Sequence, residues 1–362
     1  MVIGVPKEIK SDEGRVALTP TGVKVLTGMD HTVLVQSEAG LKSGYSDEAY
    51  RSAGAHVATA DQVYSEADMV VKVKEPIASE YQYLREGLIL FCYLHLASDL
   101  DLTLALRDSN TIAIAYETVE DTHGELPLLI PMSEIAGRMA VQAGIHYMES
   151  PHGGRGILVS GVPGVRPGRV TVIGAGVVGG NSTRMAVGLG ADVTVIDRDA
   201  RRLRYMDDLY GGRVKTLLSD EDSIASAVKE SDLLIGAVLV KGAKAPNLVS
   251  RSMVRSMAQG SLIVDVSIDQ GGCIETTGSP TTHSNPIRIT EGVNHYGVAN
   301  MPGCVPRTST MALTGVTLPY ICRLANLGVD SAIQEDPGLA MGVNVRGGAV
   351  VYSPVAEAHN LL

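Results

Sequence analysis

Residues 169–197 read RVTVIGAGVVGGNSTRMAVGLGADVTVID, and this stretch decides the fold of the middle of the chain. It opens with the β-branched run 170–173, which is typical of a buried parallel strand. The glycine-rich turn 174–179 follows, then helical periodicity to about Leu189 and a second apolar run that ends at Asp197. The order strand, turn, helix, strand predicts one unit of a parallel α/β sheet.

The turn carries the pattern G-x-G-x-x-G as Gly174, Gly176 and Gly179. In a dinucleotide-binding unit the first glycine permits the tight turn, the second lets the backbone approach a pyrophosphate, and the third lets helix and strand pack closely. Val177 and Val178 would begin the helix, whose N-terminus attracts the anion. The pattern alone is weak in a chain with 40 glycines, and the flanking strand and helix make it specific.

Asp197 lies 18 residues after Gly179, close to the spacing of about 20 expected for the carboxylate that binds the ribose hydroxyls. A carboxylate at this place repels a 2′-phosphate, so the sequence favours NAD over NADP. Three arginines follow closely, which leaves the preference open to test: Arg198, Arg201 and Arg202.

The composition predicts an ordinary globular protein of two domains. The chain has 362 residues, 45% of them hydrophobic and 19% charged, enough for two separate cores. Its net charge of −10 argues against a nucleic-acid partner, because phosphate binding needs a basic surface. No apolar run is long enough to span a membrane, and the start of the chain does not resemble a signal peptide.

Four cysteines are scattered without metal-ligand spacing, at positions 92, 273, 304 and 322. We therefore expect no metal site from cysteine and interpret them as buried thiols in a reducing compartment, which predicts a cytoplasmic protein.

Residues 1–128 alternate between apolar runs and helical segments, which predicts a second parallel α/β sheet without a glycine fingerprint. Lys74 follows the expected strand 69–73, and His95 follows the expected strand 88–94. Ligands of parallel sheets bind beyond the carboxyl ends of the strands, so both side chains are candidates for one site. Each taken singly is also compatible with a solvated lysine or a hydrogen-bonded histidine. Arg15 follows the first strand and is either a carboxylate clamp or a surface arginine.

Beyond residue 128, periodicity predicts a long helix over 131–150, either bridging the two domains or internal to one of them. After Asp197 the α/β alternation continues, and Asp269 and Asn300 each follow a predicted strand. A last helix is expected over 308–327, with a kink at Pro319.

Six blocks in order resemble the alanine dehydrogenase family: VPKEIKSDEGRVALTP, VVKVKEP, YLHLA, VIGAGVVGGN, VDVSIDQGG and VANMPGCVPRTST. The resemblance implies two Rossmann-like domains with parallel sheets, a central NAD-binding domain at 129–305 and a discontinuous substrate domain at 1–128 and 306–362. It also implies a homohexamer and the reversible, NAD-dependent oxidative deamination of L-alanine to pyruvate and ammonium.

The same resemblance assigns roles to individual residues. Arg15 and Lys74 match substrate-binding positions, and His95, Asp269 and Lys74 match catalytic positions. Positions around NAD are matched by Ser133, Gly174, Gly176, Val177, Val178, Gly179, Asp197, Arg202, Ser219, Val238, Leu239, Ile268, Asp269, Val298, Asn300 and Met301. Where the family often has Ile-Pro-Gly, this chain has Val240-Lys241-Gly242, which puts the contacts of that loop in doubt.

Three other functions are compatible with much of the sequence. The NAD(H)-binding component of a proton-translocating transhydrogenase resembles this family over much of its length, but tends to have Glu where this chain has Asp269. Saccharopine dehydrogenase is a more distant relative with a similar layout. An NAD-binding sensor without turnover would not need all four candidate catalytic and substrate-binding side chains.

Overall fold

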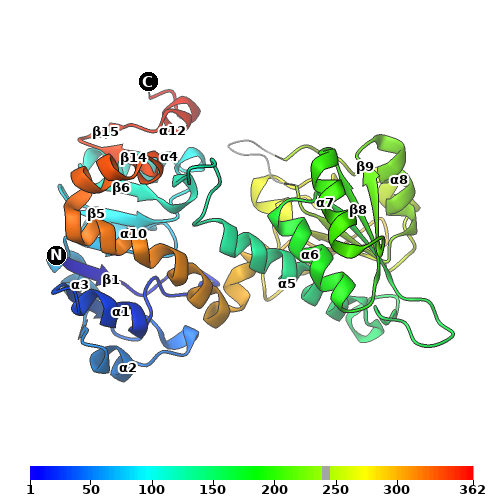
Figure 1. The fold of residues 1–362 in the computed structure, drawn as a ribbon, viewed down its shortest axis with the longest axis horizontal. Helices are drawn as coiled ribbons and strands as arrows, with labels where there is room; N and C mark the ends of the chain where they lie inside the picture. The colour runs from blue at the N-terminus through cyan, green and yellow to red at the C-terminus, as the bar shows by residue number, and fades with distance from the viewer. Residues whose placement is uncertain (239–244, 362) are drawn as a thin grey trace. The chain divides into compact units, whose positions relative to one another are not determined.

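The computed structural model describes residues 1–238 and 245–361, which fall into two compact units (Figure 1). The first unit contains residues 1–132 and 303–362, and the second contains residues 133–302. Figure 1 shows the blue start and the red end of the chain together in the first unit.

The first unit is built on an eight-stranded sheet in the order β15-β14-β6-β5-β4-β1-β2-β3. The strands from β6 to β3 are parallel, while β14 and β15 add an antiparallel edge from the end of the chain. Their bounds are β1 Val2–Val5, β2 Thr32–Gln36, β3 His56–Ala58, β4 Met69–Val71, β5 Ile89–Cys92, β6 Ile112–Ala115, β14 Val343–Arg346 and β15 Ala349–Val350.

The helices of this unit begin where the sequence supplies capping side chains. Thr19 caps α1 with Pro20 in its first turn, and Thr59 forms a reciprocal capping box with Gln62 at α3. The helices are α1 Pro20–Thr27, α2 Asp47–Ser52, α3 Ala60–Glu66, α4 Leu100–Asp108, α10 Pro306–Glu335, α11 Pro337–Met341 and α12 Ser353–Ala358. Short 3₁₀ segments are η1 Leu41–Ser43, η2 Ala78–Tyr83, η3 Leu96–Ser98 and η4 Tyr116–Thr118.

The second unit has a seven-stranded sheet in the order β12-β13-β11-β10-β7-β8-β9, parallel except for β12. Its strands are β7 Arg169–Ile173, β8 Asp192–Asp197, β9 Val214–Leu218, β10 Leu233–Gly236, β11 Leu262–Asp265, β12 Ile287–Thr290 and β13 Val293–Tyr296. Its helices are α6 Val177–Gly188, α7 Ala200–Tyr210, α8 Glu221–Glu230 and α9 Arg251–Ser256, with η5 Ser150–His152 and η6 Val266–Gln270. Two further elements cross the division of the chain, α5 Ile130–Met148 and η7 Met301–Cys304.

Both sheets have the doubly wound strand order of dinucleotide-binding domains. Counted within each unit, the first five strands lie in the spatial order 3-2-1-4-5, which reverses direction between the first and the fourth strand. The sixth strand is next to the fifth in the first unit, whereas in the second unit β13 lies between β11 and the antiparallel edge strand β12. The predicted α/β class with two Rossmann-like, mostly parallel sheets is therefore confirmed. The crevice for a ligand in such a sheet lies at the reversal, beyond the carboxyl ends of the strands.

Several predicted elements differ from the observed ones. The last helix is interrupted at Gly328, whose φ of 73° places it outside the helical region, and Pro319 lies inside the helix. Pro319 removes only one backbone hydrogen-bond donor from the helix. Gly328 interrupts the helix because its positive φ, which glycine readily adopts, is not helical. Cys304 is exposed, so the expectation that the four thiols are buried is wrong there. Among the described residues, no helix combines the length and apolar character needed to cross a membrane.

Candidate functional site

Three cationic or titratable side chains follow neighbouring strands of the first unit. Arg15 lies in the segment after β1, Lys74 after β4 and His95 after β5, where the spatial order of the sheet is β5-β4-β1. Because β1 and β4 flank the reversal of this sheet, their carboxyl ends border the expected crevice. The fold thus brings the three predicted residues to the same edge of the first unit.

Arg15 is buried and paired, which excludes a surface arginine. Only 2% of it is exposed, and Nε donates to Glu13 Oε1 at 2.7 Å while Nη1 lies 3.1 Å from Met132 Sδ. Burial lowers the pKa of Arg15, but the hydrogen bond and charge of Glu13 outweigh it and raise the pKa. The ion pair with Glu13 therefore holds the Arg15 guanidinium in one orientation. Glu13 was missed in the sequence because it lies in a run of charged residues that reads as solvated surface.

Lys74 is half-buried, and its neighbour Glu75 is buried and ionised. Burial alone raises the pKa of Glu75, but the charge of Lys74, the ion pair with Lys10 and the charge of His95 outweigh burial and lower the pKa below 4.5. Glu75 Oε2 is buried and has no hydrogen-bond partner within the described part of the chain. Lys74 and His95 thus share one buried carboxylate that the sequence analysis did not identify.

The lowered pKa of Glu75 predicts how the stability of the folded protein changes with pH in acid. Since its pKa is lowered on folding, its contribution to stability is present above pH 4.5 and is lost as the pH falls through the lower folded pKa. Glu75→Gln should therefore lower the thermal midpoint near neutral pH, and the difference from the parent protein should shrink in acid. Thermal unfolding of both proteins between about pH 3 and 8 measures this. Parallel curves over that range would contradict the assignment.

His95 has a backbone conformation that its neighbours must hold in place. Its φ of 51° and ψ of 34° lie in the left-handed region, which costs a residue other than glycine about 1–3 kcal/mol. The carboxylate of Glu117 accepts the backbone N–H of His95 at 2.6 Å and that of Leu94 at 3.1 Å. The imidazole is exposed and lies parallel to the ring of Tyr93, with 6.0 Å between centroids. Strained backbone at a strand end is typical of functional sites.

Glu117 belongs to η4, which follows β6, and contacts the His95 segment across 22 residues of sequence. We expect Glu117→Gln to lower kcat about tenfold to a hundredfold while the affinity for NAD stays unchanged, because a charge-assisted hydrogen bond is worth about 1.5–3 kcal/mol. The measurement is kcat and KM for the substrate together with NAD affinity by titration calorimetry. Glu125→Gln, at an exposed loop position, is the control. Equal kcat in both variants would remove Glu117 from a positioning role.

A buried network supports the strand end that carries Lys74. Lys72 is 1% exposed and pairs with Glu80 at 2.5 Å and with Glu8 at 3.8 Å. Glu8 Oε1 also accepts the backbone N–H of Val73 at 2.6 Å. These contacts fix the turn after β4, so the position of Lys74 is set by residues that periodicity alone does not single out.

In the second unit, the glycine turn has the geometry that a pyrophosphate requires. Gly174 has a φ of 101°, and a Cβ at Gly179 would lie 1.7 Å from the Gly174 carbonyl oxygen. Among the described residues, a Cβ at Gly176 would meet only Arg202 Nη1, at 3.5 Å, so there is room there for a ligand to approach the backbone. Val177 and Val178 follow as the first residues of α6. The turn therefore fits NAD at the position where the sequence analysis placed it.

Asp197 ends β8 and is hydrogen-bonded to this turn. Its carboxylate accepts the backbone N–H of Ala175 at 2.6 Å and that of Asp199 at 2.8 Å, and Arg202 Nη1 lies 3.8 Å away. Ser219, whose N–H donates to the Asp197 carbonyl at 3.0 Å, follows the adjacent strand β9. The predicted ribose carboxylate is thus fixed beside the glycine turn.

The remaining candidate residues of this unit also follow strands at the same end of the sheet. Val238 lies beyond β10, Ile268 and Asp269 lie in η6 beyond β11, and the segment 298–301 follows β13. Asn300 has a φ of 56° and its N–H lies 3.5 Å from Asp269 Oδ2. Val298, Ile268 and Met301 are buried, whereas Asp269 is exposed. Ser133 is half-buried near the start of α5, and Leu239 and the loop 240–242 lie outside the described residues.

Two family models together cover nearly the whole chain. The model "Alanine dehydrogenase/PNT, N-terminal domain" matches residues 4–136, and "Alanine dehydrogenase/PNT, C-terminal domain" matches residues 140–353. The chain belongs to the alanine dehydrogenase/PNT family. The resemblance predicted from the six sequence blocks is confirmed.

Relatives within the alanine dehydrogenase/PNT family match over almost their full length. The alanine dehydrogenase of Bacillus subtilis is 56% identical over 99% of this chain and 94% of its own. That of Geobacillus stearothermophilus is 54% identical over 100% of this chain and 97% of its own. A solved L-alanine dehydrogenase superposes with a TM-score of 0.97 at 50% identity, covering 99% of each chain. A transhydrogenase from Sinorhizobium meliloti has a TM-score of 0.84 at 25% identity, covering 97% of this chain and 99% of its own.

Proposed function

We propose that this chain is an NAD-dependent L-alanine dehydrogenase that catalyses the reversible oxidative deamination of L-alanine to pyruvate and ammonium. The observation that carries the proposal is the presence of Arg15, Lys74 and His95 at the carboxyl ends of β1, β4 and β5 in a doubly wound unit. We take L-alanine as the substrate because relatives at 52–56% identity are named alanine dehydrogenase.

The second unit would hold NAD through the turn 174–179, the Asp197 carboxylate and the strand ends at Ser219, Val238, Ile268 and 298–301. Ser133 and Leu239 complete the proposed set. When bound, NAD supplies the acceptor for the hydride that leaves the substrate Cα. Asp197 disfavours a 2′-phosphate on the ribose, although Arg202 lies beside it.

In the first unit, Arg15 and Lys74 would hold the substrate. The planar guanidinium of Arg15, already oriented by Glu13, suits a carboxylate that accepts two parallel hydrogen bonds. The Lys74 ammonium would bind the oxygen that becomes the carbonyl and would stabilise the negative charge that develops there during addition of water. The Arg15 side chain is held by its buried ion pair with Glu13, and the buried pair of Lys72 and Glu80 supports the strand end that precedes Lys74.

His95 would move the protons. An imidazole carries both a proton donor and a proton acceptor nitrogen, so that of His95 is suited to take a proton from the substrate amine and then from the attacking water. Its exposed ring leaves room for a substrate to reach it. Asp269 is proposed as the carboxylate that orients the ammonium or the water.

The roles of the two domains, the oligomeric state and the cellular location are proposed from the family resemblance. We assign substrate binding to 1–128 with 306–362 and NAD binding to 129–305, and we propose a cytoplasmic homohexamer acting in amino-acid catabolism. Light scattering on the purified protein would test the hexamer, and a monomer or dimer would contradict it.

The activity is tested by following NADH formation with NAD and L-alanine, then with L-serine and glycine. A parallel assay supplies NADPH as the only hydride donor, which tests for transhydrogenation. Alanine-dependent NADH formation supports the proposal. NAD binding without turnover on any amino acid would identify an NAD-binding sensor, and hydride transfer from NADPH to NAD would identify a transhydrogenase component.

A further inference from the structure

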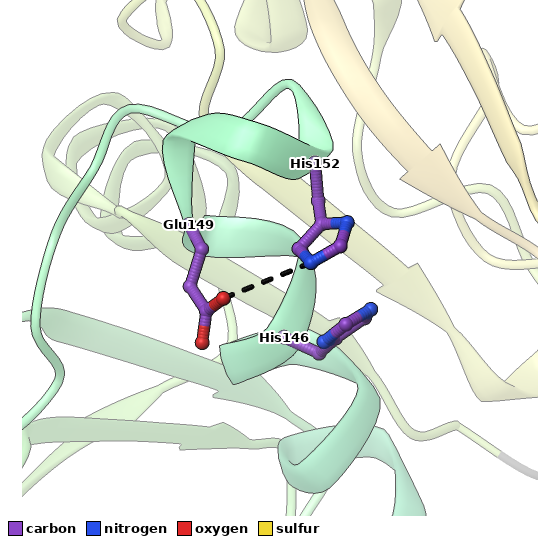
Figure 2. A group of neighbouring side chains, drawn as sticks. All are labelled: His146, Glu149 and His152. Carbon is purple, nitrogen blue, oxygen red and sulfur yellow. Dashed lines mark ion pairs between the residues drawn. The ribbon is translucent and has the colours of Figure 1, made fainter.

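A group of metal-ligating side chains lies apart from the residues assigned above. His146, Glu149 and His152 offer ligand atoms that all lie within 4.8 Å of one another. Within the described ranges 1–238 and 245–361, this is the one group of three or more His, Cys, Asp or Glu side chains that could hold a metal ion. Figure 2 shows the three side chains turned toward one another from the end of α5 and the turn that follows.

Local backbone geometry explains why these residues meet. His146 lies in the last turn of α5, and Glu149 follows directly after the end of that helix at Met148, in extended conformation. The 3₁₀ turn η5 then carries His152 back toward both side chains, three residues further on. His152 Nε2 lies 3.7 Å from Glu149 Oε2, and the two imidazole rings have centroids 3.8 Å apart.

The backbone of the turn is held in this conformation without help from the three side chains. Gly154 donates to the Glu149 carbonyl at 3.1 Å, and Gly156 donates to the Met148 carbonyl at 2.9 Å. A Cβ at Gly154 would lie 2.3 Å from the Tyr147 carbonyl oxygen, so only glycine permits this close approach. Asn294 at the start of the adjacent β13 segment also donates to the Gly153 carbonyl at 2.9 Å. The backbone that carries the three side chains is therefore formed before any ion binds.

The chemistry of the donors fits a tetrahedral transition-metal site, and their ligand atoms lie within 4.8 Å of one another, close enough for small side-chain rotations to bring them around one ion. Zn²⁺ binds imidazole nitrogen and carboxylate oxygen at about 2.0–2.2 Å, so neighbouring ligand atoms lie about 3.3–3.6 Å apart in a tetrahedron. The observed 3.7 Å between His152 and Glu149 is close to that separation. All three side chains are exposed, so an ion can enter and a water molecule can fill the fourth position. The negative end of the α5 dipole also favours a cation at this terminus.

We infer that His146, Glu149 and His152 form a binding site for Zn²⁺ or a similar divalent transition metal. Two neutral imidazoles and one carboxylate would bind the ion, with water completing its coordination. The ion would link the last turn of α5 to η5, which precedes the segment leading into β7. Its role is to stabilise the second unit, independently of hydride transfer.

The test uses the full chain, first treated with a chelator and then titrated with zinc chloride by calorimetry and followed by thermal unfolding. The parent protein should bind one Zn²⁺ per chain at this site. Its unfolding midpoint should rise by about 5 °C at a hundredfold excess over Kd. His152→Ala and His146→Ala should each weaken this binding at least about tenfold and remove the rise in midpoint.

His56→Ala is the matched control, because His56 is an exposed histidine in β3 of the other unit. It should bind Zn²⁺ and gain stability as the parent protein does. The dehydrogenase activity of chelator-treated parent and His152→Ala proteins should be equal. The inference is overturned if His152→Ala and His56→Ala bind Zn²⁺ alike, or if neither the parent nor the control binds it. Metal binding and activity are measured separately, so either proposal can fail alone.

Discussion

Replacing His95 with alanine is expected to lower kcat at least about a hundredfold and to leave the affinity for NAD nearly unchanged. General acid–base catalysis contributes about 10²–10⁴-fold, and the variant would have no group to move the protons of the amine and the attacking water. The imidazole is exposed, stacks on Tyr93 and has Nδ1 3.9 Å from Glu117 Oε1, so its removal should cost little stability. Steady-state kinetics and calorimetric NAD binding are the measurements.

The matched control is His123→Ala, at an exposed histidine of the loop after η4 in the same unit. It should keep the parent kcat. Near-normal turnover of His95→Ala would remove this residue from the acid–base role. A large loss of NAD affinity would instead indicate that the variant disturbs more than the proton transfer.

Gly179→Ala is expected to damage the NAD site most severely. The added Cβ would lie 1.7 Å from the Gly174 carbonyl oxygen, which is backbone and cannot move without shifting the turn. Overpacking of this kind costs about 1–3 kcal/mol, so we expect NAD to bind at least about tenfold more weakly and the thermal midpoint to fall. Calorimetric titration with NAD and thermal unfolding measure the two effects.

Gly188→Ala, in the last turn of the same helix α6, provides the comparison. A Cβ there would meet no atom of the described part of the chain within 4 Å, so alanine should be neutral or slightly stabilising. NAD affinity equal to that of the parent in Gly179→Ala would show that the turn does not hold the dinucleotide. A loss shared equally by both variants would point to a general effect of alanine in α6.

The parts of the fold that sequence predicted are those with a local physical signal. The strand 170–173, the glycine turn and Asp197 lie within 29 consecutive residues, and each is dictated by its own neighbours. The strand ends that carry Lys74 and His95 were predicted in the same way, because buried parallel strands form continuous apolar runs. Short or edge strands such as His56–Ala58 and Ala349–Val350 carry no such run and were not predicted.

The residues that sequence reasoning missed act through contacts between distant segments. Glu117 holds the His95 backbone from 22 positions away, and Glu8 holds the Val73 backbone from 65 positions away. In the sequence, a single glutamate that follows a strand looks the same whether it is solvated or bonded to a distant segment. Only the arrangement of the strands in the fold shows which segments such a glutamate contacts. For Glu13, the only available signal was its position two residues before Arg15 in a charged run.

The central claim is that hydride passes from the Cα of L-alanine to NAD. It is tested most directly with L-alanine carrying deuterium at Cα, by mass spectrometry of the reduced cofactor and by comparison of the initial rates with the undeuterated substrate. One deuterium is expected in each NADH formed, with pyruvate and ammonium as the other products. NADH without deuterium, or no reduction of NAD when alanine is supplied, would contradict it.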